Sequence, residues 1–362
     1  MVIRPEVVNL ILDENMGYGF NGRRKTAILK KKVHKLAREG RLTTNFFNAP
    51  GKSQMEWAYR IFSANTILGD YSWWGWEGRS QWAWTLANDR WFYPRWNGKP
   101  GKLLVIAEQG VGDEILFVSC AQEMARENPD LHWEVDHRLI PILQRSIPEV
   151  NWITRWKTQR ESGDNEPWSL TDYRGEYDAF IPAGNVPKLF RTSKQDFPRT
   201  PYLIPLEGNT GLEGRSGYVS QAGASMEKQT PHEGLGEVNL HHRLKTGPID
   251  AYDNNFERLF TRIASLNEVN AVPSAVVHIC GAIGQTCNVI MPPKILGEAN
   301  TILKWYYGRQ RKMDWYGDHV TIYRSRAEFD SERARTISKN PRSSLQGVQV
   351  GDREGRSEVL GA

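Results

Sequence analysis

A carboxylate follows a glycine-rich turn in the first half of the chain. The turn, Gln109 to Asp113, comes directly after a continuous apolar run, Leu103 to Ala107. A run of this kind predicts a buried parallel strand, and the apolar residues after the turn recur at helical spacing. Ligands of α/β domains bind at the carboxyl ends of strands, which places Asp113 beside an expected cleft. Two roles are open on these residues alone: a general base kept ionised by the helix N-terminus, or a plain helix cap.

A second candidate site lies at the start of a small, apolar segment behind Pro273. Ser274 and the amides of Ala275 and Val276 would open a helix there, and a helix N-terminus is a ready anion site. His278 falls one turn after Ser274. It either orders this helix or touches a nucleotide, or it is a satisfied core histidine. The pair His241-His242 has no acidic or cysteine partner at suitable spacing, so a metal site is disfavoured there.

Length and composition indicate a soluble two-domain protein. The 362 residues suffice for a large core, and the net charge of +5 suits anionic ligands or surfaces. The three cysteines show neither a metal-binding spacing nor a disulfide framework, which indicates a cytosolic protein. No apolar run approaches the ~20 residues that span a bilayer, and the N-terminus lacks the layout of a signal peptide.

The chain contains two series of alternating strand and helix signals, one before and one after a proline-rich segment at 198–205. Each half therefore predicts an α/β unit, and together they predict two Rossmann-type domains that face each other across a cleft. We place the first domain at 101–205 and the second at 206–326. The flanking parts are a basic, weakly ordered segment at 1–52, a small helical, tryptophan-rich cap at 53–100, and a polar, disordered tail at 327–362.

The N-terminal part carries two patterns that leave alternatives open. The basic run between Arg23 and Lys32 has interleaved apolar residues. We favour a solvated helix face over a helix that contacts a membrane or a nucleic acid. About half of the 14 tryptophans crowd between Trp73 and Trp96. A packing seam against the next domain is favoured over a platform that stacks sugars or bases, because large aromatic side chains are usually half-buried.

Three blocks of sequence resemble a known family. Glu108 to Phe117 looks like the signature of the glycosyltransferase domains that follow tetratricopeptide repeats in bacterial and phage proteins. These domains are similar to the lipopolysaccharide heptosyltransferases of glycosyltransferase family 9. The stretch 69–79 together with 94–98 resembles the join between the last repeat and the transferase. The stretch 276–284 resembles the second-domain block, in which a His precedes a small-residue helix that ends in Gly.

The resemblance implies an inverting, GT-B-like glycosyltransferase. A nucleotide sugar would bind the second domain and a glycan, glycolipid or protein acceptor the first, without an essential metal or other cofactor. Asp113 matches the family's catalytic base, with Glu114 as the alternative base and Glu108 as a supporting partner. Lys228 lies in a segment like the family's phosphate loop, where it would neutralise the leaving diphosphate. The resemblance also implies a donor-binding set, Ser220, Gln221, Ser274, Ala275, His278 and Gly281, and an acceptor-side turn, Gln109, Gly110, Gly112 and Glu114.

The sequence departs from the family at one position that bears on function. Pro273-Ser274 stands where the family has Asp-Thr, and Pro cannot replace a carboxylate. The alternative to an enzyme is therefore a catalytically silent nucleotide- or glycan-binding module, followed by an aromatic and basic nucleic-acid binder. A dehydrogenase is disfavoured, because Gly110-Val111-Gly112 lacks the third glycine of the dinucleotide motif. We expect a cytoplasmic protein, with any contact to the inner membrane face made by the basic N-terminal segment.

Overall fold

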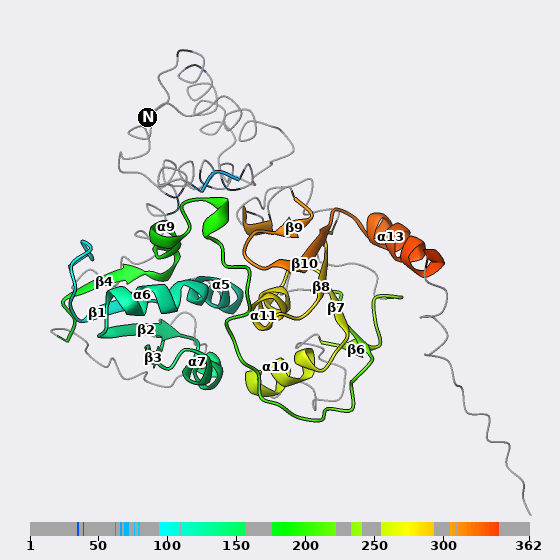
Figure 1. Ribbon diagram of the computed structural model, residues 1–362, viewed down its shortest axis with the longest axis horizontal. Helices are drawn as coiled ribbons and strands as arrows, with labels where there is room; N and C mark the ends of the chain where they lie inside the picture. The colour runs from blue at the N-terminus through cyan, green and yellow to red at the C-terminus, as the bar shows by residue number, and fades with distance from the viewer. Residues whose placement is uncertain are drawn as a thin grey trace, which may run out of the picture.

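The computed structural model describes most of the chain between residues 94 and 339 (Figure 1). The described ranges are 94–108, 110–155, 176–221, 233–240, 255–292, 305–307 and 310–339, together with Lys35, Glu39, Phe62, Thr66, 69–71, Trp76 and Arg79. The expected basic segment at 1–52 therefore lies almost entirely outside the described residues. So does most of the tryptophan-rich cap.

The first half contains a parallel sheet of four strands in the order β3-β2-β1-β4. The strands are β1 (Leu103–Ile106), β2 (Leu131–Val135), β3 (Asn151–Thr154) and β4 (Ala179–Pro182). All four residues of β1 are buried, as expected of a central parallel strand that is covered on both faces. The predicted strand at Leu103 is thus confirmed.

Short helices connect these strands. They are α5 (Val111–Phe117), η4 (Val118–Cys120), α6 (Ala121–Glu127), η5 (His137–Leu139), α7 (Ile140–Ser146), η6 (Ala183–Asn185), α9 (Pro187–Phe190) and η7 (Lys194–Asp196). The helix expected after the glycine turn starts at Val111, and its helical path ends at the cap Asn128, just before Pro129. A 3₁₀ turn divides it where Ser119 donates its hydroxyl to the Leu116 carbonyl, 2.7 Å away.

The second half contains a six-stranded sheet in the order β6-β5-β7-β8-β10-β9. Its strands are β5 (Ser216–Val219), β6 (Val238–Asn239), β7 (Glu268–Ala271), β8 (Cys287–Ile290), β9 (Lys312–Met313) and β10 (Gly317–Tyr323). Every pairing is parallel except that of β9 with β10. The helices of this half are α10 (Phe256–Ala264), α11 (Ala275–Ile283), η11 (Trp305–Tyr307) and α13 (Arg326–Lys339).

Both sheets reverse their strand order at one point. In the first sheet β1 lies between β2 and β4, and in the second β5 lies between β6 and β7. Ligands of open α/β sheets bind at such points, outside the carboxyl ends of the strands. Asp113 follows the carboxyl end of β1 and Ser274 that of β7, so each candidate motif stands at the reversal of its own sheet.

The two halves are packed together through α5 and α11, which lie side by side near the centre of Figure 1. The contact is close: a Cβ added to Gly112 would lie 3.3 Å from the Ala275 Cα atom. The proline-rich segment 198–205, which connects the two halves, also contributes to the contact between α5 and α11. Tyr202 donates its hydroxyl to the Ile115 carbonyl at 2.7 Å, and its amide to the Ala282 carbonyl at 2.9 Å. One buried apolar cluster therefore extends through both halves.

The α/β class with parallel sheets is confirmed, while the expected disordered tail is helical over its first part. Helix α13 reaches from Arg326 to Lys339, and Phe329 on it is buried against Tyr323 with the two rings nearly perpendicular. Burial of Phe329, together with the ion pair of Arg333 with Glu268 of β7 at 3.6 Å, holds this largely polar helix to the sheet. For the cap, Trp76 is buried and donates its indole N–H to the Arg191 carbonyl at 2.7 Å, which fits a packing seam.

Candidate functional site

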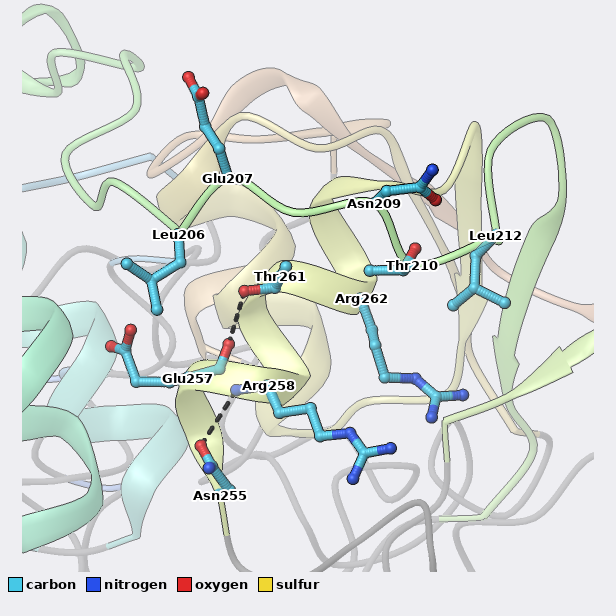
Figure 2. A pocket seen from close by; sticks show the side chains of 10 residues that line it. All are labelled: Leu206, Glu207, Asn209, Thr210, Leu212, Asn255, Glu257, Arg258, Thr261 and Arg262. Atoms are coloured by element: carbon cyan, nitrogen blue, oxygen red, sulfur yellow. Dashed lines mark hydrogen bonds between the residues drawn. The ribbon is translucent and has the colours of Figure 1, made fainter.

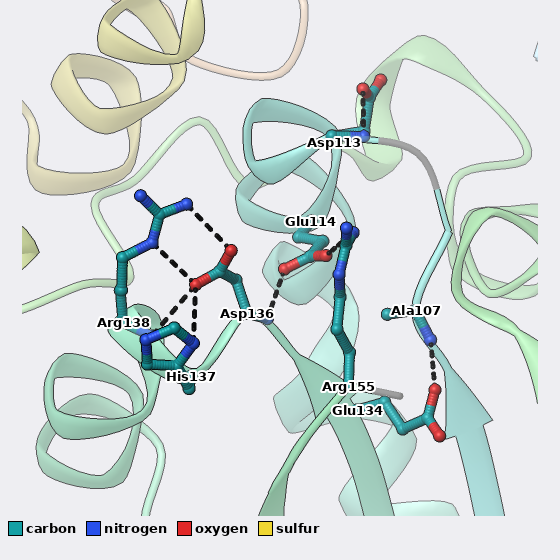
Figure 3. A network of polar contacts seen from close by, with 9 residues as sticks. Ala107, Asp113, Glu114, Glu134, Asp136, His137, Arg138 and Arg155 are labelled. Atoms are coloured by element: carbon teal, nitrogen blue, oxygen red, sulfur yellow. Dashed lines mark hydrogen bonds and ion pairs between the residues drawn. The ribbon is translucent and has the colours of Figure 1, made fainter. Parts of the chain in front are cut away.

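Asp113 is half-buried in the first turn of α5. Its Oδ2 atom accepts the Gly110 amide at 3.4 Å, a long hydrogen bond that makes it a weak cap of its own helix. Figure 3 shows its carboxylate directed away from Glu114, on the opposite side of α5. Both roles considered for Asp113, cap and base, are compatible with this placement.

Glu114 points into the interior of the first half. Its Oε2 atom accepts the Asp136 amide at 2.7 Å and its Oε1 atom accepts Arg155 Nη1 at 2.8 Å (Figure 3). Burial raises the pKa of Glu114 to about 7, and the Arg155 charge opposes that rise. Glu114 therefore ties α5 to the carboxyl ends of β2 and β3, and it does not share a face with Asp113.

Asp136, directly after the carboxyl end of β2, links the two halves of the structure through Arg138. Arg138 donates Nε and Nη2 to the two oxygens of Asp136, each at 2.9 Å (Figure 3). Burial alone would raise the pKa of Asp136, but the bonds and charge of Arg138 outweigh it and lower the pKa. The guanidinium of Arg138 also stacks 4.3 Å from the ring centre of Phe256 at the start of α10. This network positions α10 against the first sheet.

Glu108 belongs to a buried network at the reversal of the first sheet. Its two oxygens accept Arg79 Nη2 at 2.8 Å and the Gly184 amide at 2.5 Å. A Cβ at Gly184 would collide with the Arg79 guanidinium, so the position accepts only glycine. The next residue, Asn185, is 4% exposed, and neither atom of its amide has a hydrogen-bond partner among the described residues. A buried amide without a hydrogen-bond partner is a candidate for contact with a ligand.

The N-terminus of α11 carries a second unpartnered group. Ser274 is the extended N-cap residue, and its hydroxyl makes no capping bond. The buried Oγ atom has no partner among the residues that the structure describes. The Ser274 carbonyl accepts the Val277 amide at 3.2 Å, which leaves the Ala275 and Val276 amides as donors at the helix end. A hydroxyl and free amides at a helix N-terminus can bind an anion.

His278 lies one turn further along α11, enclosed by aromatic side chains. Its Nδ1 atom is 3.1 Å from the Tyr316 hydroxyl, and its ring stands nearly perpendicular to Tyr306 with centroids 5.0 Å apart. Burial lowers the pKa of His278 to about 3, so the imidazole is neutral at physiological pH. Its Cδ2 atom would lie 3.0 Å from a Cβ on Gly112, so the ring borders the turn that carries Asp113.

The structure thus brings part of the predicted site together. Ser220 and Gln221 follow β5 next to Val272-Pro273-Ser274, because the Val272 amide donates to the Val219 carbonyl at 2.9 Å. Gly281 lies under the ring of Tyr316, where a Cβ would collide with that ring, so it serves packing in this structure. Gln109, Lys228 and the pair His241-His242 lie outside the described residues.

Sequence reasoning did not find three residues of this region. Asn185 follows β4, and its polar side chain near the carboxyl end of that strand was a usable signal. Tyr202 and Tyr316 reach the site only through tertiary packing. They come from the connecting segment and from the turn before β10, and no local pattern marks either of them.

A separate pocket of about 540 Å³ lies between the segment 206–212 and α10 (Figure 2). Arg258 and Arg262 extend along it from α10, while Glu257 at its edge pairs with Arg145 of α7 at 3.0 Å. A second hollow of about 390 Å³ borders the segment 197–204. Neither pocket contains a residue of the predicted site.

Part of the chain is similar in sequence to one known protein. Protein FlbA of Caulobacter vibrioides is 28% identical to this chain over 155 residues, which are 39% of this chain and 24% of that protein. The match thus spans about a quarter of the relative's length. No family model and no solved structure matches the chain. The likeness covers too little of either protein to assign a family.

Two further findings concern metals and membranes. Within the described residues, no three His, Cys, Asp or Glu side chains gather as metal ligands would. The three cysteines, Cys120, Cys280 and Cys287, are buried and unpaired by disulfides. Among the helices of the described ranges, none combines the length and the apolar character that crossing a membrane requires.

Proposed function

We propose that the chain is an inverting glycosyltransferase of GT-B architecture, which moves a sugar from a nucleotide-sugar donor to a glycan, glycolipid or protein acceptor. One observation carries the proposal. The reversal points of the two mainly parallel sheets lie where α5 touches α11, with a carboxylate, Asp113, on one side and the N-terminus of α11 on the other. Transfer to a hydroxyl with loss of a diphosphate needs both of these groups.

Each side of the junction would supply one half of the chemistry. The acceptor oxygen forms a bond to the anomeric carbon as the bond from that carbon to the diphosphate breaks. Asp113 takes the acceptor proton, and the electron pair of the broken bond stays on the diphosphate. The Ser274 hydroxyl and the first amides of α11 would stabilise the leaving anion, with Lys228 as its counter-charge. This reaction needs no metal or other cofactor, and a cytoplasmic location belongs to the same proposal.

The unpartnered buried groups support a ligand at this junction. Asn185 stands at the end of β4 on the proposed acceptor side, and Ser274 at the end of β7 on the donor side. Leaving such groups without hydrogen bonds costs about 1–3 kcal/mol each, which a bound ligand would recover. Their places at the two reversal points match the two substrates that a transferase must hold.

Asp113→Asn tests the proposal, with Asp130→Asn as the matched control. Asp130 is an exposed carboxylate in the turn before β2, at the other edge of the first sheet. Release of nucleoside diphosphate and transfer to acceptors would be measured over a panel of nucleotide sugars. We expect Asp113→Asn to lose ~10²–10⁴-fold in rate and the control to be unchanged. Equal rates for both variants would remove Asp113 as the base.

A silent binding module is the second candidate, because Pro273 is buried where the family has a carboxylate. This candidate predicts that nucleotide sugars bind to the wild type but are not turned over with any acceptor. If no nucleotide or nucleotide sugar binds, both candidates fail. The nucleic-acid alternative rests on residues 23–96, which lie almost entirely outside the described residues.

A further inference from the structure

The pocket between the segment 206–212 and α10 is built from elements that α7 holds in place (Figure 2). On α7, Arg145 donates Nε to the Ile204 carbonyl at 2.8 Å, and the Ser146 hydroxyl accepts the Ile204 amide at 2.8 Å. The same arginine contacts both carboxylate oxygens of Glu257 on α10, at 3.1 and 3.0 Å. Arg145 therefore anchors both walls of the pocket. The pocket volume of about 540 Å³ falls within the roughly 300–1,000 Å³ that is typical of small-molecule sites.

Two arginines of α10 extend along this pocket. Arg258 and Arg262 are four residues apart, so they lie on one face of the helix, and Figure 2 shows both guanidinium groups on the same side of α10. Like charges at this spacing repel each other. The Arg262 guanidinium forms no hydrogen bond or ion pair with any residue that the structure describes. An anion bound between the two arginines would relieve their repulsion and give Arg262 a partner.

Neither carboxylate that lines the pocket pairs with Arg262. Glu257 is bound to Arg145, which approaches it from α7. Glu207 is exposed, and Figure 2 shows its carboxylate directed away from α10. The pocket therefore presents positive charge to a ligand. It also presents apolar surface, because Leu206 lines it and remains 48% exposed.

The pair of arginines favours a phosphate over a carboxylate. A carboxylate has one charge and two oxygens, so a single arginine satisfies it, as Arg145 does for Glu257 in the same region. A phosphate monoester carries about −1.5 to −2 charges at pH 7 and has three acceptor oxygens. It can therefore accept hydrogen bonds from two guanidinium groups at once, a geometry that arginine suits better than lysine does.

We propose that this pocket binds the phosphate monoester group of an amphiphilic ligand, with Arg258 and Arg262 on the phosphate and Leu206 on the apolar part. The pocket shares no residue with the junction of α5 and α11. The inference therefore goes beyond the proposed function and does not depend on it. Two sources offer this chemistry: a soluble phosphorylated molecule, and a lipid whose headgroup is a phosphate monoester.

Calorimetry on the full-length protein tests the ligand class with butyl phosphate, inorganic phosphate and pentanoate. We expect butyl phosphate to bind most tightly, because inorganic phosphate lacks the apolar part and pentanoate is a carboxylate of similar length. Arg262→Gln and Arg258→Gln should each weaken the binding of butyl phosphate about ten- to hundredfold, since each removes a charge-assisted hydrogen bond. Arg262→Lys should recover only part of the affinity, because it keeps the charge but loses the planar fork. The matched control is Arg335→Gln, at an exposed arginine on α13, which should bind like the wild type.

Flotation with vesicles of phosphatidylcholine, with and without phosphatidic acid, separates the two sources. Binding to butyl phosphate alone indicates a soluble ligand, and binding to phosphatidic acid vesicles that Arg262→Gln abolishes indicates a lipid; either result supports the site. Binding of butyl phosphate that is unchanged in Arg262→Gln and Arg258→Gln would place the phosphate elsewhere, such as the N-terminus of α11, and would overturn the site. Equal affinity for pentanoate would overturn the phosphate assignment. Binding to neither butyl phosphate nor the vesicles would overturn the proposal and leave the proposed transferase activity untouched.

Discussion

Gly112→Ala probes the contact on which the proposed site depends. The added Cβ would lie 3.0 Å from His278 Cδ2 and 3.3 Å from Ala275 Cα. Neither neighbour can yield easily. Ala275 is backbone in the first turn of α11, and the His278 ring is held between Tyr316 and Tyr306. The substitution should therefore push α5 and α11 apart.

The size of the effect follows from two opposing contributions. Ala in place of Gly favours a helix by up to about 1 kcal/mol. Overpacking of a close contact costs ~1–3 kcal/mol, and here one of the atoms met is main chain. We expect a net loss of ~1–2 kcal/mol in the free energy of unfolding, which lowers Tm by ~2–8 °C for domains of this size.

Urea and thermal unfolding would measure this loss against Gly208→Ala. Gly208 is exposed, and a Cβ there would meet its nearest atom, Thr261 Cγ2, at an ordinary 3.5 Å. The cost of Gly112→Ala should also shrink in a His278→Ala background, because one of the two clashes is then absent. If Gly112→Ala is as stable as Gly208→Ala, or if its cost is the same in both backgrounds, the close approach of the helices is not as described.

Two further predictions concern buried titratable groups: His278, and the ion pair of Arg79 with Glu108. Burial lowers the pKa of His278 from an ordinary 6.5 to about 3, so between these values the unfolded chain binds a proton that the native protein does not. Native stability should fall on acidification by up to ~1.4 kcal/mol per pH unit, and His278→Asn should reduce this slope in urea unfolding at about pH 7 and about pH 5. For the buried pair of Arg79 and Glu108, Arg79→Met should cost ~3–5 kcal/mol in urea unfolding, because it leaves an uncompensated carboxylate. Adding Glu108→Gln should recover part of that loss, and a single variant of native stability would contradict the buried pair.

Much of the fold could be predicted because its signals are local. The apolar runs of β1 and β2 are buried parallel strands, and helix α10 has its apolar residues Phe260 and Ile263 on the buried face. Ser274 was expected to open a helix and is the N-cap of α11. Each of these follows from residue types within a few positions along the chain.

The remaining features depend on partners far away in the sequence. The polar composition after Ala327 indicated disorder, yet burial of Phe329 against Tyr323 gives α13 a tertiary contact that composition does not reveal. His278 was equally compatible with the core and with a ligand. Its contact with Tyr316, 38 residues later, and the approach of Gly112 show that it is enclosed on one side and faces α5 on the other.

Gly112 and Gly281, one in each of two blocks that resemble the transferase family, are both required by close packing. Gly112 has no Cβ because Ala275 and His278 occupy that space, and Gly281 has none because the Tyr316 ring lies there. Both glycines thus allow α5, α11 and the Tyr316 ring to come together. We infer that, in the proposed transferase, the glycine turn would act by bringing Asp113 close to α11. A larger residue at either glycine should impair binding at the junction even with Asp113, Ser274 and His278 intact.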